Sequence, residues 1–300
     1  MNNYLSHYSA AEKWDIPHIE TVLGREFSKE DRIHVTFSEH GARVRNKGKI
    51  VHSCQIELPD GAVIKRNGNW VASPELLFLE LASDLSLHRL ILLGLQLCSH
   101  PPVSPSKAIT TKRKLEDFLG KTPGYSGRCK ALRALHYVED GSASIMESLA
   151  YMILTLPHAL GGYGLGGAVF NQEIALKEEG HMRLAKMSCF TDLYYAQAKL
   201  AVEYDSFKYH GSPLKQGEDS IRASILERQG IEVMHLSTIQ LYDQNACDDF
   251  ARNLAARLGK RMQIRAKKFD EERALLRSLL SAGRSEAIRD QVNPPDGYTL

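Results

Sequence analysis

Cysteine is scarce in this sequence, and the cysteines that occur do not form the close pairs of zinc ribbons or redox motifs. Five are present, an odd number spread along the chain at positions 54, 98, 129, 189 and 247. Because there is no CxxC pair, the sequence indicates neither a disulfide framework nor a cysteine-based metal site. We therefore expect reduced thiols.

Long apolar runs are also missing. No stretch approaches the roughly 18 apolar residues of a membrane span, and the first residues lack the basic and apolar segments of a signal peptide. We therefore expect a cytoplasmic protein with no membrane partner.

A strong charge of one sign is absent as well. The sequence has 38 Lys and Arg residues against 36 Asp and Glu residues, a net charge of +2, so any basic surface must be local. Hydrophobic residues at 43% and charged residues at 25% exclude a disordered, collagen-like or coiled-coil chain. The 12 histidines contain no HExxH pair, so their spacing gives no indication of zinc.

A length of 300 residues predicts two domains rather than one. The Pro- and Ser-rich segment near residue 105 is the clearest interruption of the chain and is predicted to be a linker. The expected organisation is an N-terminal β-rich and helical domain at 1–100, a linker at 101–111, a second domain at 112–245 and a basic helical extension at 246–300.

Two segments give local detail. Alternating apolar runs between Ile33 and Val71, broken by turn residues, predict a small β-rich region. An apolar stretch then follows Ser73 and Pro74, which suit the N-cap and the first helical position of a buried helix. Beyond the linker, two short basic helices and the apolar helix of SASIMESLAYMILTLP are expected, and this last helix carries a single acid, Glu147.

The run TDLYYAQAKLAVEYD contains two alternating segments that predict a β-hairpin. A turn centred between Gln197 and Ala198 sets Leu193 opposite Val202 and Tyr195 opposite Leu200 on one face. The same register sets Asp192 opposite Glu203 on the other face, and the two-residue strand period adds Asp205.

Like charges placed opposite each other destabilise a strand pair, so something is expected to compensate them. Mg²⁺ does so naturally, since it takes oxygen ligands from one or two carboxylates and fills its other positions with water and phosphate oxygens. The alternative is a different turn register, in which these acids point to solvent.

A helix from Glu218 to Gln229 and the buried-type strand IEVMHL follow the hairpin. Strand, strand, helix, strand, preceded by an acidic helix, predicts an α/β (α+β) fold with a mixed sheet, a crossover and a site at the strand ends.

The tail carries the local basic surface. Between Phe250 and Phe269 it has seven Lys and Arg residues, no acid and a helical pattern. Such a helix is expected to contact a phosphate backbone, or else to expose a solvated face. The expected nucleic-acid contacts are Arg257, Lys260, Arg261 and Arg265 in this tail, together with Arg222 in the helix before it.

These motifs resemble the very-short-patch-repair-like endonuclease domain, a branch of the PD-(D/E)XK nuclease superfamily. The branch shows a helical Glu, an Asp, an E-x-D-G-x-x-H segment, a D-x-x-R helix and a G-x-x-V strand. The matching positions here are Glu147, Asp192, Glu203, Asp205, His210, Asp219, Arg222, Gly230 and Val233. The similarity covers about residues 127–242, and the first half loosely resembles the leading regions of antitoxin-like regulators.

The resemblance implies a restriction-endonuclease-like mixed sheet flanked by helices, after a smaller N-terminal α+β domain. It also implies Mg²⁺ or Mn²⁺ held by Asp192, Glu203 and Asp205, with Glu147 orienting a ligand. His210 is the implied acid or base. The sequence departs from the pattern in having Ser206 for the usual glycine and no E-x-K lysine, and Lys208 or Lys199 stands nearby as a substitute.

The expected function is that of a metal-dependent DNA endonuclease that hydrolyses phosphodiester bonds. The alternative is a catalytically inactive, nuclease-fold DNA-binding regulator, and a third possibility is a nuclease directed at RNA. A homodimer would be the simpler route to cutting both strands. The GxGxxG run at Gly162 follows a helix rather than a strand, so no organic cofactor is expected.

Overall fold

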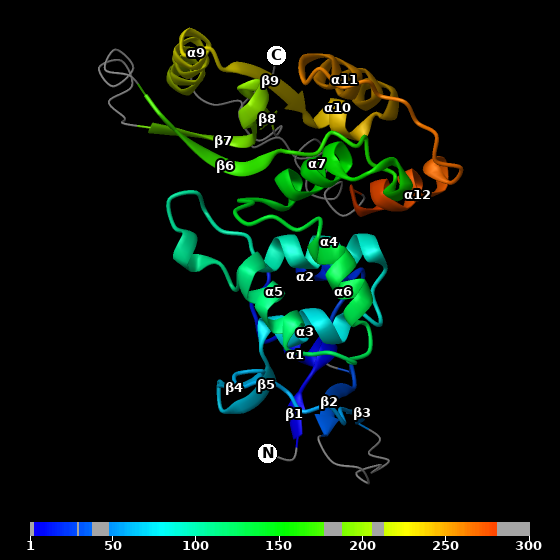
Figure 1. The fold of residues 1–300 in the computed structure, drawn as a ribbon. Helices are drawn as coiled ribbons and strands as arrows, with labels where there is room; N and C mark the ends of the chain where they lie inside the picture. Colours follow the sequence, from blue (N-terminus) through cyan, green and yellow to red (C-terminus); the bar gives the residue numbers. More distant parts are fainter. Residues whose placement is uncertain (1–2, 29, 38–47, 177–187, 206–212, 281–300) are drawn as a thin grey trace, which may run out of the picture. The chain divides into compact units, whose positions relative to one another are not determined.

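The computed structural model describes residues 3–28, 30–37, 48–176, 188–205 and 213–280, without the side chains of 213–219. The chain divides into two compact units, Met1–Gly141 and Ser142–Leu300 (Figure 1). Each unit contains its own mixed sheet and its own helices, which confirms the expected α/β class. Within these residues, no helix has the length and apolar character that a membrane crossing requires.

The first unit is built on a mixed sheet with strand order β3-β2-β1-β5-β4. Its strands are β1 (Asn3–Leu5), β2 (Ile33–Phe37), β3 (Lys49–Ser53), β4 (Val63–Arg66) and β5 (Asn69–Ala72). The central strand β1 was not expected from the sequence, because three residues are too few to show an alternation. One segment expected to be extended, residues 42–46, lies outside the described residues.

Helices accompany this sheet and form the apolar core of the first unit. They are α1 (His7–Ala11), α2 (Ile19–Leu23), α3 (Pro74–Leu81), α4 (Leu87–Leu97), α5 (Lys112–Gly120) and α6 (Arg128–Leu135). The predicted cap of α3 is confirmed, since the Ser73 side chain accepts a hydrogen bond from the Leu76 amide at 3.2 Å.

The expected linker at 101–111 was wrong as a domain boundary. Helix α5 buries Leu115, Phe118 and Leu119 and packs on α3 and α6, so residues 101–111 lie within the first unit. The chain divides instead after Gly141, and residues 246–280 belong to the second unit with α7 and the second sheet. Proline and serine marked a connection between packed helices, which composition alone does not distinguish from a linker.

The second unit contains a sheet of strand order β6-β7-β8-β9. Its elements in chain order are α7 (Ile145–Thr155), β6 (Val169–Ala175), β7 (Ser188–Tyr195), β8 (Leu200–Asp205), α9 (Pro213–Arg228) and β9 (Glu232–Ser237). Strands β6, β7 and β8 are antiparallel neighbours, while β9 runs parallel to β8 after the crossover through α9. The predicted crossover is confirmed, whereas β6 was not anticipated.

The predicted hairpin register is confirmed. Leu193 pairs with Val202 and Tyr195 with Leu200, all four side chains are buried, and Lys199 adopts φ +49° in the turn. A slip of one residue would have exchanged the apolar and acidic faces.

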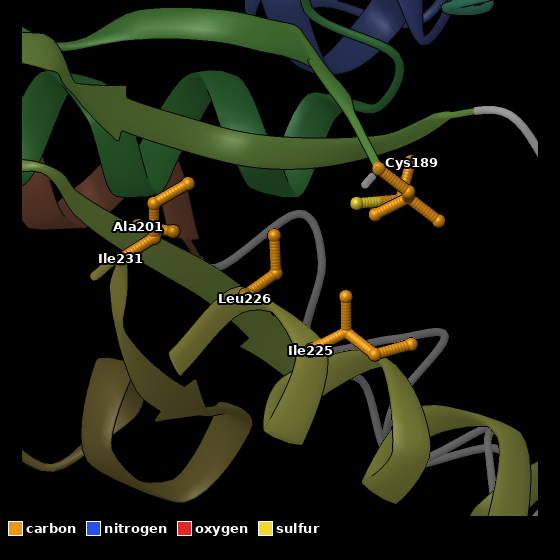
Figure 2. Close-up of a cluster of buried hydrophobic side chains, with 6 residues drawn as sticks. Cys189, Ala201, Ile225, Leu226 and Ile231 are labelled. Atoms are coloured by element: carbon orange, nitrogen blue, oxygen red, sulfur yellow. The ribbon is translucent and has the colours of Figure 1, made fainter. Parts of the chain in front are cut away.

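Helix α9 covers one face of the second sheet through a small apolar cluster (Figure 2). Ile225 and Leu226 of α9 pack with Cys189 of β7, Ala201 of β8 and Ile231, all buried. Helix α7 contacts the same strands and places the Tyr151 ring 4.7 Å from that of Phe170. The acidic residues on β7 and β8 therefore lie within a packed sheet rather than on a free hairpin.

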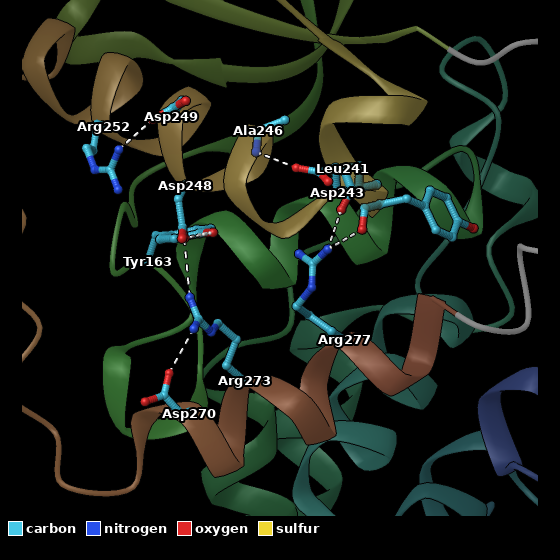
Figure 3. A network of polar contacts seen from close by, with 11 residues as sticks. Tyr163, Leu241, Asp243, Ala246, Asp248, Asp249, Arg252, Asp270, Arg273 and Arg277 are labelled. Atoms are coloured by element: carbon cyan, nitrogen blue, oxygen red, sulfur yellow. Dashed lines mark hydrogen bonds and ion pairs between the residues drawn. The ribbon is translucent and has the colours of Figure 1, made fainter.

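The C-terminal helices are held by polar contacts (Figure 3). The helices are α10 (Thr238–Tyr242), α11 (Gln244–Arg257) and α12 (Phe269–Arg277). Asp248 accepts hydrogen bonds from the Tyr163 hydroxyl at 2.6 Å and from Arg273 at 3.3 Å, and Arg277 donates to the Leu241 carbonyl at 3.0 Å. These contacts join α12 to α10, α11 and the glycine-rich connector of residues 161–168.

The expected continuous basic helix in the tail was wrong. Helix α11 ends at Arg257, and residues 259–268 are not helical. The amides of Gly259 and Lys260 bond back to the Ala256 and Ala255 carbonyls, an arrangement that closes a helix C-terminus.

Gly161 is expected to tolerate no side chain. Its φ is +75°, and a Cβ there would lie 2.3 Å from the Arg273 amide nitrogen. Gly161→Ala should lower the free energy of unfolding by about 2 kcal/mol, measured by urea denaturation. Gly167→Ala is the control, because its φ is +104° but a Cβ meets nothing within 4 Å. Equal losses in the two variants would contradict the steric explanation.

Candidate metal centre

Asp192 and Glu203 lie side by side where the pairing of β7 and β8 stops. The last bridged pair before them is Leu193 with Val202. The Asp192 carboxylate accepts a hydrogen bond from the Tyr204 amide at 2.8 Å, so a side chain takes the place of a backbone carbonyl at this point. The carboxylates lie close enough that Asp192 raises the pKa of Glu203.

Glu203 is the most deeply buried acid of the group, with 5% of its surface exposed. Its Oε2 lies 3.3 Å from the Arg222 guanidinium, whereas Oε1 is buried and has no hydrogen-bond partner within the described part of the chain. Burial and the charge of Asp192 raise the Glu203 pKa to about 7, although Arg222 opposes the shift. An unpaired buried carboxylate oxygen is costly, and a cation would compensate it.

Asp205 stands at the exposed end of β8 and pairs with His235. The His235 Nδ1 lies 3.1 Å from the Asp205 carboxylate, and both side chains are about half exposed. In the parallel pairing of β8 and β9, His235 is the register partner of Glu203. The Thr238 hydroxyl donates to the Asp205 carbonyl at 3.1 Å and fixes the strand end. The sequence did not reveal His235 as a neighbour of Glu203, because this parallel register does not follow from spacing along the chain.

Glu147 reaches the group from α7, where it also closes the helix N-terminus. Its carboxylate accepts hydrogen bonds from the Ala143 amide at 2.9 Å and the Ser144 hydroxyl at 2.9 Å. Burial and the charge of Asp192 raise the Glu147 pKa to about 7. Because the helix start occupies both oxygens, the geometry suits a positioning role better than direct ligation.

Asn171 of β6 is a site residue that the sequence did not reveal. Its amide donates to the Glu147 carboxylate at 3.0 Å. The bridged pairs on either side of it set Asn171 opposite Asp192, and its backbone has φ +44°. This left-handed conformation is uncommon outside glycine and is best tolerated by Asn and Asp. Asn171 thus links Glu147 to the strand that carries Asp192.

Arg222 had been expected to contact DNA, and the structure places it differently. Besides the ion pair with Glu203, its guanidinium donates to the Phe190 carbonyl at 3.3 Å. It therefore belongs to the acidic cluster.

The remaining predicted DNA contacts are not brought together with the acids. Arg257 pairs with Glu232 at the start of β9, the end of the strand away from His235. Lys260 donates to the Gly166 carbonyl at 2.6 Å, and Arg261 and Arg265 are exposed in the segment after α11.

Two predicted catalytic residues, His210 and Lys208, lie outside the described residues, as do Ser206 and the side chain of Asp219. The alternative base Lys199 lies in the hairpin turn, four residues before Glu203. At about 3.3 Å per residue that is roughly 13 Å along the strand, so Lys199 is too distant to act at this site.

Comparison of the chain with protein-family models, curated proteins and solved structures found no match. A function for this chain therefore has to be inferred from the arrangement of its side chains. Four acids from α7, β7 and β8, three of them with raised pKa, lie near one another, and within the described residues they have Arg222 and His235 as basic neighbours.

The stability of the metal-free protein should depend on the protonation of Glu203. Its pKa rises from 4.5 to about 7 on folding, so the stability that the neutral carboxyl contributes is present at pH 4.5 and is lost as the pH passes 7. Glu203→Gln removes this loss. In EDTA, the free energy of unfolding of the variant, relative to that of the wild type, should increase by about 1–3 kcal/mol from pH 5 to pH 8. Thermal unfolding of both proteins at pH 5 and pH 8 measures their difference in stability. A difference that is equal at the two pH values would contradict the raised pKa of Glu203.

Proposed function

We propose that the second unit hydrolyses phosphodiester bonds in DNA in a reaction that depends on Mg²⁺ or Mn²⁺. The observation that carries this proposal is the buried Glu203 beside Asp192, with one carboxylate oxygen unpartnered among the described residues. The single charge of Arg222 offsets this pair in part, and a divalent cation at the unpartnered oxygen would offset the rest.

The residues present fit a hard divalent cation. Mg²⁺ prefers carboxylate oxygens, needs only one or two of them and retains waters, so Asp192 and Glu203 would suffice as ligands, with Asp205 at the open side. When bound, Mg²⁺ supplies positive charge at the scissile phosphate and activates water for attack. Asn171 and Glu147 would hold the strand of Asp192 in place, and Arg222 would hold Glu203.

The order of elements is consistent with the family resemblance. Helix α7 carries the Glu, β7 the Asp, β8 the E-x-D pair and α9 the Arg, and β9 follows Gly230. The exposed residues Lys260, Arg261 and Arg265 offer contacts for phosphates. These residues follow α11 rather than the strands that carry the acids, which favours a polymeric substrate that contacts both regions over a single phosphodiester.

Incubation of the full chain with supercoiled plasmid, single-stranded DNA and RNA, each with Mg²⁺, Mn²⁺ or EDTA, tests this proposal. We expect metal-dependent cleavage of DNA that EDTA abolishes. DNA binding without cleavage under any condition would contradict the enzyme and favour the inactive regulator. Cleavage confined to RNA would keep the chemistry and replace the substrate.

A further inference from the structure

Three histidines of the first unit converge from separate elements. His7 begins α1, His34 lies on β2 and His52 on β3. One potential ligand atom from each lies within 4.8 Å of the others, an arrangement that no other histidine, cysteine or carboxylate group reaches in the described part of the chain. The parallel register of β2 and β3 explains part of it, because His34 pairs with Ile50 and His52 follows two residues later on the same face.

The three rings are closely packed, and the His34 and His52 rings share a hydrogen bond whose donor depends on the tautomer. The His34 Nδ1 lies 3.1 Å from the His52 Nε2, and the His7 and His52 rings stack with centroids 3.7 Å apart. The His7 Nδ1 is buried and has no hydrogen-bond partner among the described residues. Because buried polar atoms are nearly always paired, this nitrogen points to an interaction that the protein alone does not supply.

The backbone and a buried carboxyl group hold His7 in position. His7 has φ +48°, a left-handed conformation that is uncommon for residues other than glycine. The buried Glu80 carboxylate accepts hydrogen bonds from the His7 amide and the Tyr4 hydroxyl, both at 3.0 Å. It also lies 3.7 Å from the His7 Nδ1. Glu80 therefore holds His7 through its backbone amide, and its distance from the Nδ1 is too long for a hydrogen bond, so this nitrogen remains available to a ligand.

A cavity of about 600 Å³ opens beside this group. His7, His52 and Glu80 line it together with Asp84 and Tyr125 of the same unit.

We propose that His7, His34 and His52 bind one Zn²⁺ ion through one imidazole nitrogen each, and that its fourth coordination position faces the cavity. Three protein ligands and an open position define the catalytic rather than the structural type of zinc site. Tetrahedral zinc with bonds of about 2.0–2.1 Å sets ligand nitrogens about 3.3 Å apart. His34 and His52 already match this spacing, and the His7 ring must turn out of its stack on His52.

This site is independent of the acidic cluster, because imidazole nitrogens favour zinc whereas carboxylate oxygens favour Mg²⁺. Isothermal titration of the untagged full chain with Zn²⁺ at pH 7.5 tests it. We expect one ion per chain with a Kd below about 10 μM, and binding by Glu203→Gln equal to that of the wild type. Absence of such binding to the folded wild type would overturn the proposal, whatever the variants do.

Variants assign the ligands. His52→Ala should weaken binding by at least about 100-fold, and the weaker effect of Glu80→Gln should be about 10-fold. His136→Ala is the matched control, because His136 is exposed in the same unit, and it should bind as the wild type does. Circular dichroism establishes that each variant is folded. Unchanged affinity in folded His52→Ala would place the ion elsewhere and overturn the assignment.

Discussion

Glu203→Gln is expected to abolish Mg²⁺-dependent DNA cleavage while leaving the second unit folded. The carboxylate is the buried half of the pair that would hold the cation, and glutamine keeps its size while removing its charge. Several kcal/mol of transition-state charge stabilisation depend on such a ligand, which corresponds to a rate loss on the order of 10³-fold. Initial rates of plasmid nicking at saturating Mg²⁺ measure the effect.

Glu232→Gln provides the matched control for this loss. Glu232 lies on β9 of the same sheet, pairs with Arg257 and is half exposed. Its substitution should leave the cleavage rate within about a factor of two, because exposed ion pairs contribute little. If both variants retained wild-type activity, the acidic cluster would not be the site of hydrolysis. The same Glu203→Gln protein should be more stable than the wild type in EDTA at pH 8, which separates loss of function from loss of fold.

Arg222→Met is expected to destabilise the metal-free protein at pH 8 by about 3 kcal/mol. The substitution removes the guanidinium that lies 3.3 Å from the buried Glu203 carboxylate and leaves that charge without its cationic partner. Addition of Mg²⁺ should restore part of this loss, so the rise in melting temperature with Mg²⁺ should be larger in the variant than in the wild type.

Arg252→Met tests whether the effect is specific to the cluster. Arg252 on α11 is well exposed and pairs with Asp249 one helical turn away. Its replacement should change the free energy of unfolding by less than about 0.5 kcal/mol, with or without Mg²⁺. An Arg222→Met protein as stable in EDTA as Arg252→Met would mean that Glu203 does not depend on Arg222.

The register of the hairpin could be predicted from the sequence, but not all of its side-chain contacts. The positions of Leu193 and Val202 follow from a two-residue period and a short turn, so their pairing could be predicted. The hydrogen bond that the Tyr204 amide donates to the Asp192 carboxylate could not be predicted, because it depends on where the backbone pairing stops.

Residues that join the site from distant segments were beyond prediction for a related reason. Asn171 belongs to β6, a strand without a clear alternation of apolar residues, and its left-handed backbone leaves no mark in the sequence. His235 becomes a neighbour of Glu203 only through the parallel register set by α9. Non-local pairings of this kind depend on the packing of whole elements rather than on spacing along the chain.

The same limit applies to the first unit. His7, His34 and His52 do not match a zinc spacing, because their meeting depends on the start of α1 lying against β2 and β3. The expected linker was misplaced because proline and serine indicate an interruption of regular structure, whereas a domain boundary depends on which helices share a core.

Anomalous diffraction from crystals of the full chain soaked in Mn²⁺ tests the central claim most directly. The account predicts a manganese peak at about 2.2 Å from carboxylate oxygens of both Asp192 and Glu203, and loss of that peak in Glu203→Gln crystals. Clear density for the two side chains with no manganese between them, at a concentration that saturates other Mn²⁺ sites, would contradict it.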